Sequence, residues 1–357
     1  MSEQTPPPSV QAKTLNVLET VLIGIGGGAL FYWAQLPGGL ITGAMVAVAA
    51  AGLSGRKMGL PQPLAHVILM TLGLSLGSMV SPAMIHNLSA YPVTIAMLAA
   101  ATFCSTFGSS YYLQWVHGWD RTSALLAGSP GALSQIIMLA TERKADVPGI
   151  AVVQIMRVII LTGAVPMLLA ASGMMGHGPL PSRGPIATPL ALAELAAVAV
   201  AAALLLRWLK FPAAWMFGAM LGSSVLHGAG LVEGTLPQWA YIAALTGIGT
   251  LIGSRFGAIR LRTILSHLGA ALGSFAVAIA ISSVFVTAIA LTMHVKFSDV
   301  VVAFAPGAMD AMLALALTLH VDPVFVGAHH LSRFIFVSIA TPGIVHLFGR
   351  AADDLDD

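Results

Sequence analysis

The stretch SALLAGSPGALSQIIMLATE, residues 123–142, is apolar and carries Ser129-Pro130-Gly131 near its middle. A second stretch, AFAPGAMDAMLALALT at residues 303–318, carries Ala305-Pro306-Gly307. Proline has no backbone N–H and glycine is a poor helix former, so together they break a helix. Each stretch is therefore predicted to be a broken helix that enters a membrane and returns to the same side. The alternative is a kink in a spanning helix.

The rest of the chain has the composition of a membrane protein. Its 357 residues are 57% hydrophobic and only 8% charged, with a mean hydropathy of +0.89, whereas soluble domains carry about 25% charged residues. The length fits ten to twelve spans of about 20 residues. The single cysteine, Cys104, allows no thiolate cluster, and no cofactor is predicted. A net charge of +2 without a basic run argues against a nucleic-acid partner.

The two halves of the chain repeat each other. Residues 130–166 and 306–342 share 10 identities in 37 ungapped positions at an offset of 176, including the Pro-Gly-Ala run, an Asp and an Arg. The predicted organisation has five parts: a polar N-terminal tail 1–14, membrane repeat 15–172, a Gly- and Pro-rich linker 173–186, membrane repeat 187–348 and an acidic C-terminal tail 349–357.

The lysines and arginines favour halves that run in opposite directions. Twelve crossings would divide the loop charges 7 against 7, whereas a non-crossing Pro-Gly segment in each half gives 12 cytoplasmic against 2 outside, Arg183 and Lys296. A non-crossing segment after each break gives 10 against 4. Short cytoplasmic loops normally carry the excess. The predicted fold is an all-α polytopic protein with an inverted 5+5 repeat, in a bacterial inner membrane, with the N-terminus cytoplasmic.

Polar residues near the two breaks form the predicted solute site. A helix that restarts after Pro-Gly presents unpaired N–H groups and a positive dipole end, which suits an anion. The two arginines within spans, Arg157 and Arg333, could bind that anion or clamp the hairpins through carbonyls and Asp310. Asp310 could bind a cation, carry a proton or pair with Arg333. Asp146 and Asp322 are predicted helix N-caps. The predicted solute-binding residues are Ser129, Gly131, Ser134, Gln135, Arg157, Gly307, Asp310, His330 and Arg333; no catalytic or metal-binding residue is predicted.

The repeated residues resemble the AbrB-type membrane protein family of bacteria, also called the AbrB duplication family. The resemblance covers nearly the whole chain, and it implies no established catalytic residue. Members carry the labels ammonia monooxygenase and regulator of gene expression. The matching residues are Leu36-Pro37 with Gly43-Ala44, Ser129 to Ser134 with Asp146 and Arg157, and the second copy Ala305 to Ala308 with Asp322, His329 and Arg333.

Three functions are weighed. The leading prediction is a secondary transporter-like protein that moves a small solute through a midplane site at two broken helices, with an anion as the favoured solute. The alternative is a membrane-embedded regulator of gene expression that acts through a partner, as the family label implies. A monooxygenase is disfavoured, because copper or iron needs clustered ligands and the 11 histidines are scattered. The chain is thus predicted not to be an enzyme. Its predicted partners are the lipid bilayer and a small-molecule solute, and a homo-oligomer is left open.

Overall fold

The computed structural model describes residues 10–79, 91–130, 133–172, 185–211, 213–258, 261–307, 309–319 and 321–348. Four predicted features lie wholly or partly outside these ranges: residues 1–9 of the N-terminal tail, the site residue Gly131, residues 173–184 of the linker 173–186, and the C-terminal tail 349–357. The regular elements of the described residues are helices, and one isolated parallel bridge pairs Ile186 with Thr235. The all-α prediction is confirmed.

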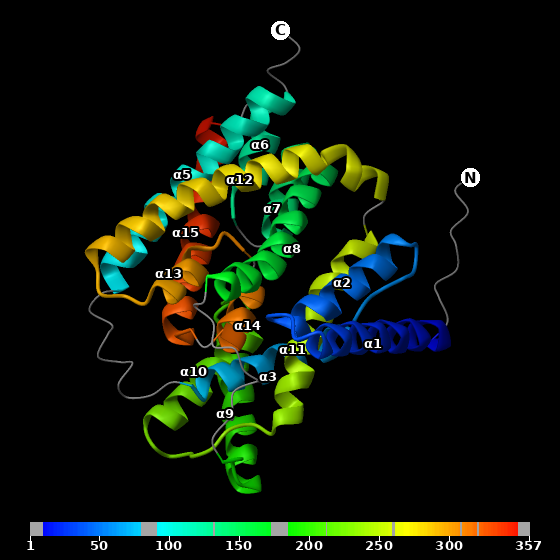
Figure 1. Cartoon of the computed structure of the whole chain (residues 1–357), viewed down its shortest axis with the longest axis vertical. Helices are drawn as coiled ribbons and strands as arrows, with labels where there is room; N and C mark the ends of the chain where they lie inside the picture. The colour runs from blue at the N-terminus through cyan, green and yellow to red at the C-terminus, as the bar shows by residue number, and fades with distance from the viewer. Residues whose placement is uncertain are drawn as a thin grey trace.

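The described helices follow the same order in both halves (Figure 1). In the first half they are α1 (Val10–Trp33), α2 (Gly39–Leu53), α3 (Gln62–Gly77), α5 (Tyr91–His117), α6 (Arg121–Gly128), α7 (Leu133–Glu142) and α8 (Val147–Ala171). In the second half they are α9 (Pro189–Trp208), α10 (Ala214–Gly228), α11 (Gln238–Ser254) with the short 3-10 turn η2 (Arg255–Ala258), α12 (Leu261–Thr292), α13 (Phe297–Phe304), α14 (Met309–Leu319) and α15 (Pro323–Phe348).

Six of the described helices are long and apolar enough to cross a membrane: α1 from Thr14 onward, α5, α8, α9, α12 and α15. The helices α2, α3, α10 and α11 have only 15, 16, 15 and 17 residues. At 1.5 Å per residue they are about 22–26 Å long, which is less than the hydrocarbon thickness of about 30 Å. Four of the ten predicted crossings are therefore shorter than the predicted length of about 20 residues.

The breaks fall where proline forces them. Ser129 and Ala305, each followed by proline, have extended backbones with ψ of 122° and 125°. A residue before proline is pushed out of the helical region, and proline cannot donate a helical hydrogen bond. Each predicted broken helix is therefore broken at the predicted place.

Each broken segment folds back as a helical hairpin. The backbone N–H of Asp146, after α7, donates to the Ser123 hydroxyl at the start of α6 across 2.8 Å. In the second half the backbone N–H of Asp322, after α14, donates to the Asp299 carboxylate at the start of α13. The base of each hairpin is therefore closed by a hydrogen bond between equivalent positions, which a kinked straight helix could not form.

The two aspartates at the hairpin bases also begin the next long helix. The Asp146 carboxylate accepts from the Gly149 N–H at 3.2 Å, at the start of α8. The Asp322 carboxylate accepts from the N–H groups of Val324 and Phe325 at 2.8 and 3.1 Å, at the start of α15. These bonds satisfy donors that the first helical turn leaves free. The predicted N-caps are confirmed.

The short helices pair reciprocally between the halves, with α3 on α10 and α2 on α11. Glycine makes both contacts close, because a Cβ added at Gly77 would lie 2.5 Å from the Met220 carbonyl oxygen, and one at Gly253 would lie 2.5 Å from that of Met45. Small residues at such positions let helix backbones approach without a side chain between them. Together with α1 and α9 these helices form a first bundle.

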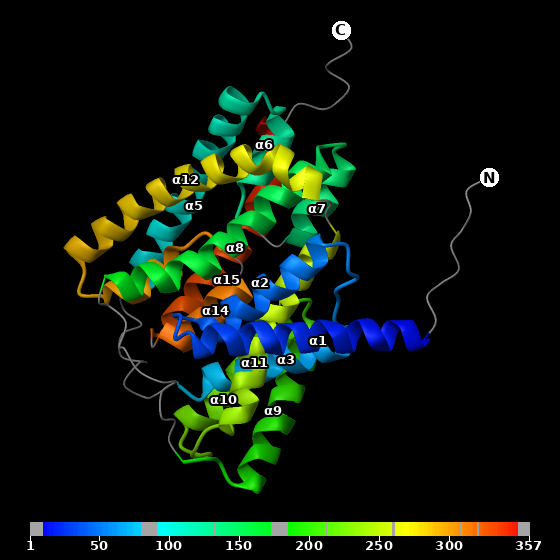
Figure 2. The ribbon, with the colours of Figure 1, turned by 45° about the vertical axis from the view of Figure 1, so that its right-hand side comes forward.

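The long helices α5 and α12 cross in a second bundle, which also holds both hairpins, α8 and α15 (Figure 1 and Figure 2). The Ser109 hydroxyl of α5 donates to the Ser274 carbonyl of α12 at 2.9 Å. Earlier on α5, Gly108 lies against Ile281, and later Tyr112 lies against Gly273. Residue numbers rise on α5 as they fall on α12, so the two helices are antiparallel.

The two hairpins enter the second bundle from opposite ends of α5. The first hairpin starts at Arg121, four residues after α5 ends at His117. The base of the second hairpin lies beside Phe325, whose ring packs edge-on against Tyr91, the first residue of α5, with centroids 5.4 Å apart. Since α5 has 27 residues and is about 40 Å long, the two tips point toward each other near the middle of the protein.

Candidate functional site

A cavity of about 730 Å³ lies between the hairpin tips and the first bundle. Most of its wall comes from the hairpins, α8 and α15, while Ala213, Ile252 and Arg255 belong to the first bundle. The cavity therefore lies where the two bundles meet. The full set of lining residues is Pro130, Leu133, Gln135, Ile137, Gln154, Ile155, Arg157, Val158, Ala213, Ile252, Arg255, Pro306, Gly307, Met309, Asp310, His330, Arg333 and Phe334.

In the first half, α8 holds the C-terminal end of α6 with two side chains. The Arg157 guanidinium donates through Nη2 to the Ala127 carbonyl at 2.9 Å. Three residues earlier, the Gln154 amide donates to the carbonyls of Leu126 at 3.1 Å and Ser129 at 2.7 Å. The i, i+3 spacing puts both side chains on the same face of α8.

In the second half, α15 holds the end of α13 in the same way. Arg333 donates to the carbonyls of Ala303 at 2.5 Å and Ala305 at 2.6 Å. His330, three residues earlier, donates through Nε2 to the Val302 carbonyl at 3.1 Å. At the offset of 176, these acceptors correspond to those that Arg157 and Gln154 use.

The arginines satisfy the ends of two interrupted helices. The last carbonyls of a helix lack internal partners and carry partial negative charge, so a cation there is stabilising. The carbonyl clamp, one of the two alternatives that the sequence left open for Arg157 and Arg333, is thus present in the structure. It leaves part of each guanidinium unused.

Both arginines line the cavity and retain unpaired, buried donors. Arg157 and Arg333 are only 2% and 4% exposed. Nε and Nη1 of Arg157 and Nε of Arg333 have no hydrogen-bond partner in the described part of the chain, and no described carboxylate forms an ion pair with either residue. A buried charge is costly unless it is paired, and these groups have the chemistry to donate to an anion.

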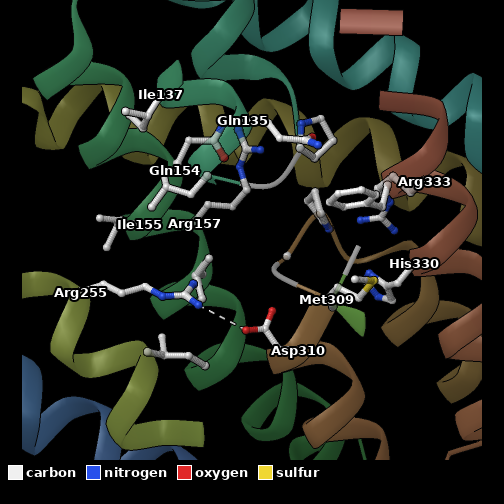
Figure 3. Close-up of a pocket in the computed structure, with 18 residues that line it drawn as sticks. Gln135, Ile137, Gln154, Ile155, Arg157, Arg255, Met309, Asp310, His330 and Arg333 are labelled. Carbon is white, nitrogen blue, oxygen red and sulfur yellow. Dashed lines mark hydrogen bonds and ion pairs between the residues drawn. The ribbon is translucent and has the colours of Figure 1, made fainter. Parts of the chain in front are cut away.

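Asp310 makes its ion pair with Arg255 rather than with Arg333. Its carboxylate lies 3.3 Å from the Arg255 guanidinium, across the interface between α14 and η2 (Figure 3). The side chains are 22% and 35% exposed, respectively. In the sequence Arg255 is recognisable only as a loop charge, because nothing local links it to a residue 55 positions away. At the offset of 176, the equivalent positions are Met79 and Ser134, so the first half has no such pair.

The other predicted site residues divide into those that line the cavity and those that do not. Gln135 and Gly307 line the cavity, and the Gln135 amide oxygen accepts from the Ser338 hydroxyl at 2.9 Å. Ser129 is not part of the lining, because its hydroxyl donates to the Leu125 carbonyl at 3.0 Å. Ser134 lies in α7, and its side chain is outside the described part. Gln154 and Arg255 line the cavity although sequence analysis did not select them.

Histidine, cysteine and carboxylate side chains are dispersed in the described ranges. No group of three or more of them lies close enough there to hold a metal ion. His329 is fully buried and bonded through both ring nitrogens, to the Phe325 carbonyl at 2.7 Å and the Thr94 hydroxyl at 2.8 Å. His330 lines the cavity instead.

The fold and the cavity define an all-helical protein with membrane-type apolar helices and two helical hairpins. Residues 40–349 match the family described as "Transition state regulatory protein AbrB", and the chain belongs to this family. The Bacillus subtilis (strain 168) protein named "Uncharacterized protein YhjN" is 26% identical over 339 residues, covering 87% of this chain and 84% of that protein. The Escherichia coli (strain K12) protein named "Putative regulator AbrB" is 25% identical over 350 residues, covering 97% and 98%.

Proposed function

We propose that this chain is a transporter-like membrane protein that binds a small anionic solute in the cavity between its hairpin tips. The observation that carries the proposal is the pair of buried arginines, one from each half, that line the cavity and keep unpaired N–H donors. Transporters with two related halves commonly bind solutes near the bilayer midplane, where broken helices meet. Binding and movement of the solute, without catalysis, is the proposed activity.

We further propose that the halves are inverted repeats. The equivalent helices α5 and α12 pack antiparallel, which supports opposite directions. The pair α2 and α11 gives independent support, because Gly249 lies nearest Ile41 and Gly253 nearest Met45, so those helices run parallel. Successive helices joined by a short loop usually run antiparallel. If α2 and α3 are antiparallel, α3 runs opposite to α11, because α11 is parallel to α2. Since α3 and α11 are equivalent helices, one half is then inverted relative to the other.

The proposed membrane arrangement follows from this inversion. Hairpins that enter from opposite ends of α5 would enter from opposite faces of the bilayer, and their tips would meet near its centre. The N-terminus is assigned to the cytoplasm of a bacterial inner membrane, because this orientation gives the excess of lysine and arginine on the cytoplasmic side.

Purified protein reconstituted in vesicles tests the proposal. Small radiolabelled carboxylates and inorganic phosphate are the probes, and vesicles with an Arg157→Gln/Arg333→Gln double variant are the matched control. We expect at least one anion to accumulate faster with the wild type, and the difference to vanish in the double variant. Equal rates in wild-type, double-variant and empty vesicles for every anion would refute the transport proposal.

A membrane-embedded regulator is the second candidate, because the matching family and the E. coli relative carry regulator in their printed descriptions. Such a role would act through a partner. Expression profiling of a deletion strain separates the two proposals. Restoration of the profile by an Arg333→Gln variant that is inactive in vesicles would favour regulation through another part of the protein.

A further inference from the structure

We infer that the cavity takes a dianion whose two negative groups are separated, with the chemistry of a short dicarboxylate, and that each group contacts one of the two buried arginines. The inference rests on the proposed function, because it names the class of anion that the same cavity would receive.

Among the charged side chains of the described cavity wall, two positive groups have no carboxylate partner. Four charged side chains line it, and Arg255 and Asp310 offset each other across 3.3 Å. Arg157 and Arg333 remain, without a described carboxylate partner. Both line one cavity, and like charges repel each other.

The helix dipoles at the tips do not change this balance. A helix C-terminus carries about −0.5 charge and an N-terminus about +0.5. Each tip joins the C-terminus of one half-helix, α6 or α13, to the N-terminus of the next, α7 or α14, so the two contributions nearly cancel. Buried, uncompensated charge is costly, and a ligand with two negative charges removes that cost more completely than a ligand with one.

The placement of the arginines favours two separate anionic groups. Arg157 is carried by α8 and tied to α6, whereas Arg333 is carried by α15 and tied to α13. Figure 3 shows them on different sides of the pocket. Their carbonyl bonds hold each guanidinium to its own hairpin, which disfavours convergence of both on one compact ion. A volume of about 730 Å³ falls in the range of small-molecule sites, about 300–1,000 Å³.

Calorimetry on the full chain in nanodiscs tests the inference with four probes. Succinate and glutarate are separated dianions, butyrate is a monoanion of similar length, and sulfate is a compact dianion. We expect succinate or glutarate to bind at least about tenfold more tightly than butyrate, because close charge pairs contribute at least that much. Sulfate is expected to bind no more tightly than butyrate.

Single charge-removing variants test whether each arginine contacts one of the two anionic groups. In Arg157→Gln, and separately in Arg333→Gln, we expect the preference for the dicarboxylate over butyrate to fall by about tenfold or more, while butyrate still binds. Arg157→Lys keeps the charge and is expected to keep most of the preference. Monodisperse elution of each variant in size-exclusion chromatography shows that it has folded.

The outcomes distinguish failure of the dicarboxylate inference from failure of the proposed anion site. Butyrate binding as tightly as both dicarboxylates, or sulfate binding most tightly, overturns the dicarboxylate inference and leaves an anion site in place. A preference unchanged in both Gln variants overturns the assignment of one group to each arginine. Failure of the wild type to bind any of the four probes overturns the inference and the anion site of the proposed function together.

Discussion

Substitution Gly253→Ala should weaken the contact between α11 and α2. The added Cβ would lie 2.5 Å from the Met45 carbonyl oxygen and 3.0 Å from the Val48 Cβ. Ordinary van der Waals contact begins at 3.4 Å, so the helices must separate by about 1 Å, a gap that removes up to about half of the dispersion energy between facing atoms. Overpacking of this kind costs about 1–3 kcal/mol.

The matched control is Gly26→Ala, because a Cβ at this position of α1 meets nothing within 4 Å. Both variants gain helix propensity, so their difference isolates the packing cost. At about 2 °C per kcal/mol for a chain of this size, the apparent melting temperature of Gly253→Ala in detergent should be about 2–6 °C below that of Gly26→Ala. Gly77→Ala, at the equivalent contact of α3 with α10, should lower the melting temperature by a similar amount. Equal melting temperatures for Gly253→Ala and Gly26→Ala would refute the close approach of the two helices.

Three further predictions concern the hairpins and the cavity. Arg157→Gln should lower stability by about 1.5–3 kcal/mol, since a charge-assisted hydrogen bond to a helix end is lost, and Arg157→Lys by less; equal melting temperatures of the two variants would contradict the clamp. A double-mutant cycle on Arg255 and Asp310 should give a coupling of about 1 kcal/mol or less that shrinks in high salt, because the pair is partly exposed; a larger, salt-independent coupling would contradict that environment. Cysteines placed at Lys144 and Lys296 in a cysteine-free chain should be labelled from the cytoplasm and from outside, respectively, and labelling of position 144 from outside would exclude the proposed arrangement of the first hairpin.

The local features of the fold were predictable because they depend on few neighbouring residues. Pro130 and Pro306 break their helices wherever the chain places them, since the missing N–H is a property of the residue. Asp146 and Asp322 cap helices through the N–H groups two or three residues ahead. The offset of 176 also let each such feature be recognised twice.

The tertiary features were not predictable from the same patterns. The pair of Arg255 with Asp310 depends on how η2 meets α14, and no periodicity encodes that contact. Hydropathy also suggested full-length spans where α2 and α10 have only 15 residues each. Burial between other helices makes a short segment as apolar as a lipid-facing one. Ser129 illustrates the same limit, because its hydroxyl could have faced the cavity or its own helix.

The reciprocal pairing of short helices has a consequence for synthesis. The helices α2 and α3 leave the ribosome long before their partners α11 and α10, with roughly 200 residues between Met45 and Gly253. At about 5–20 residues per second, the first half waits about 10–40 s with its glycine-lined faces unpaired. Expression of the first half alone should therefore yield a protein that is degraded or aggregates, whereas co-expression of both halves as separate chains should restore a stable complex.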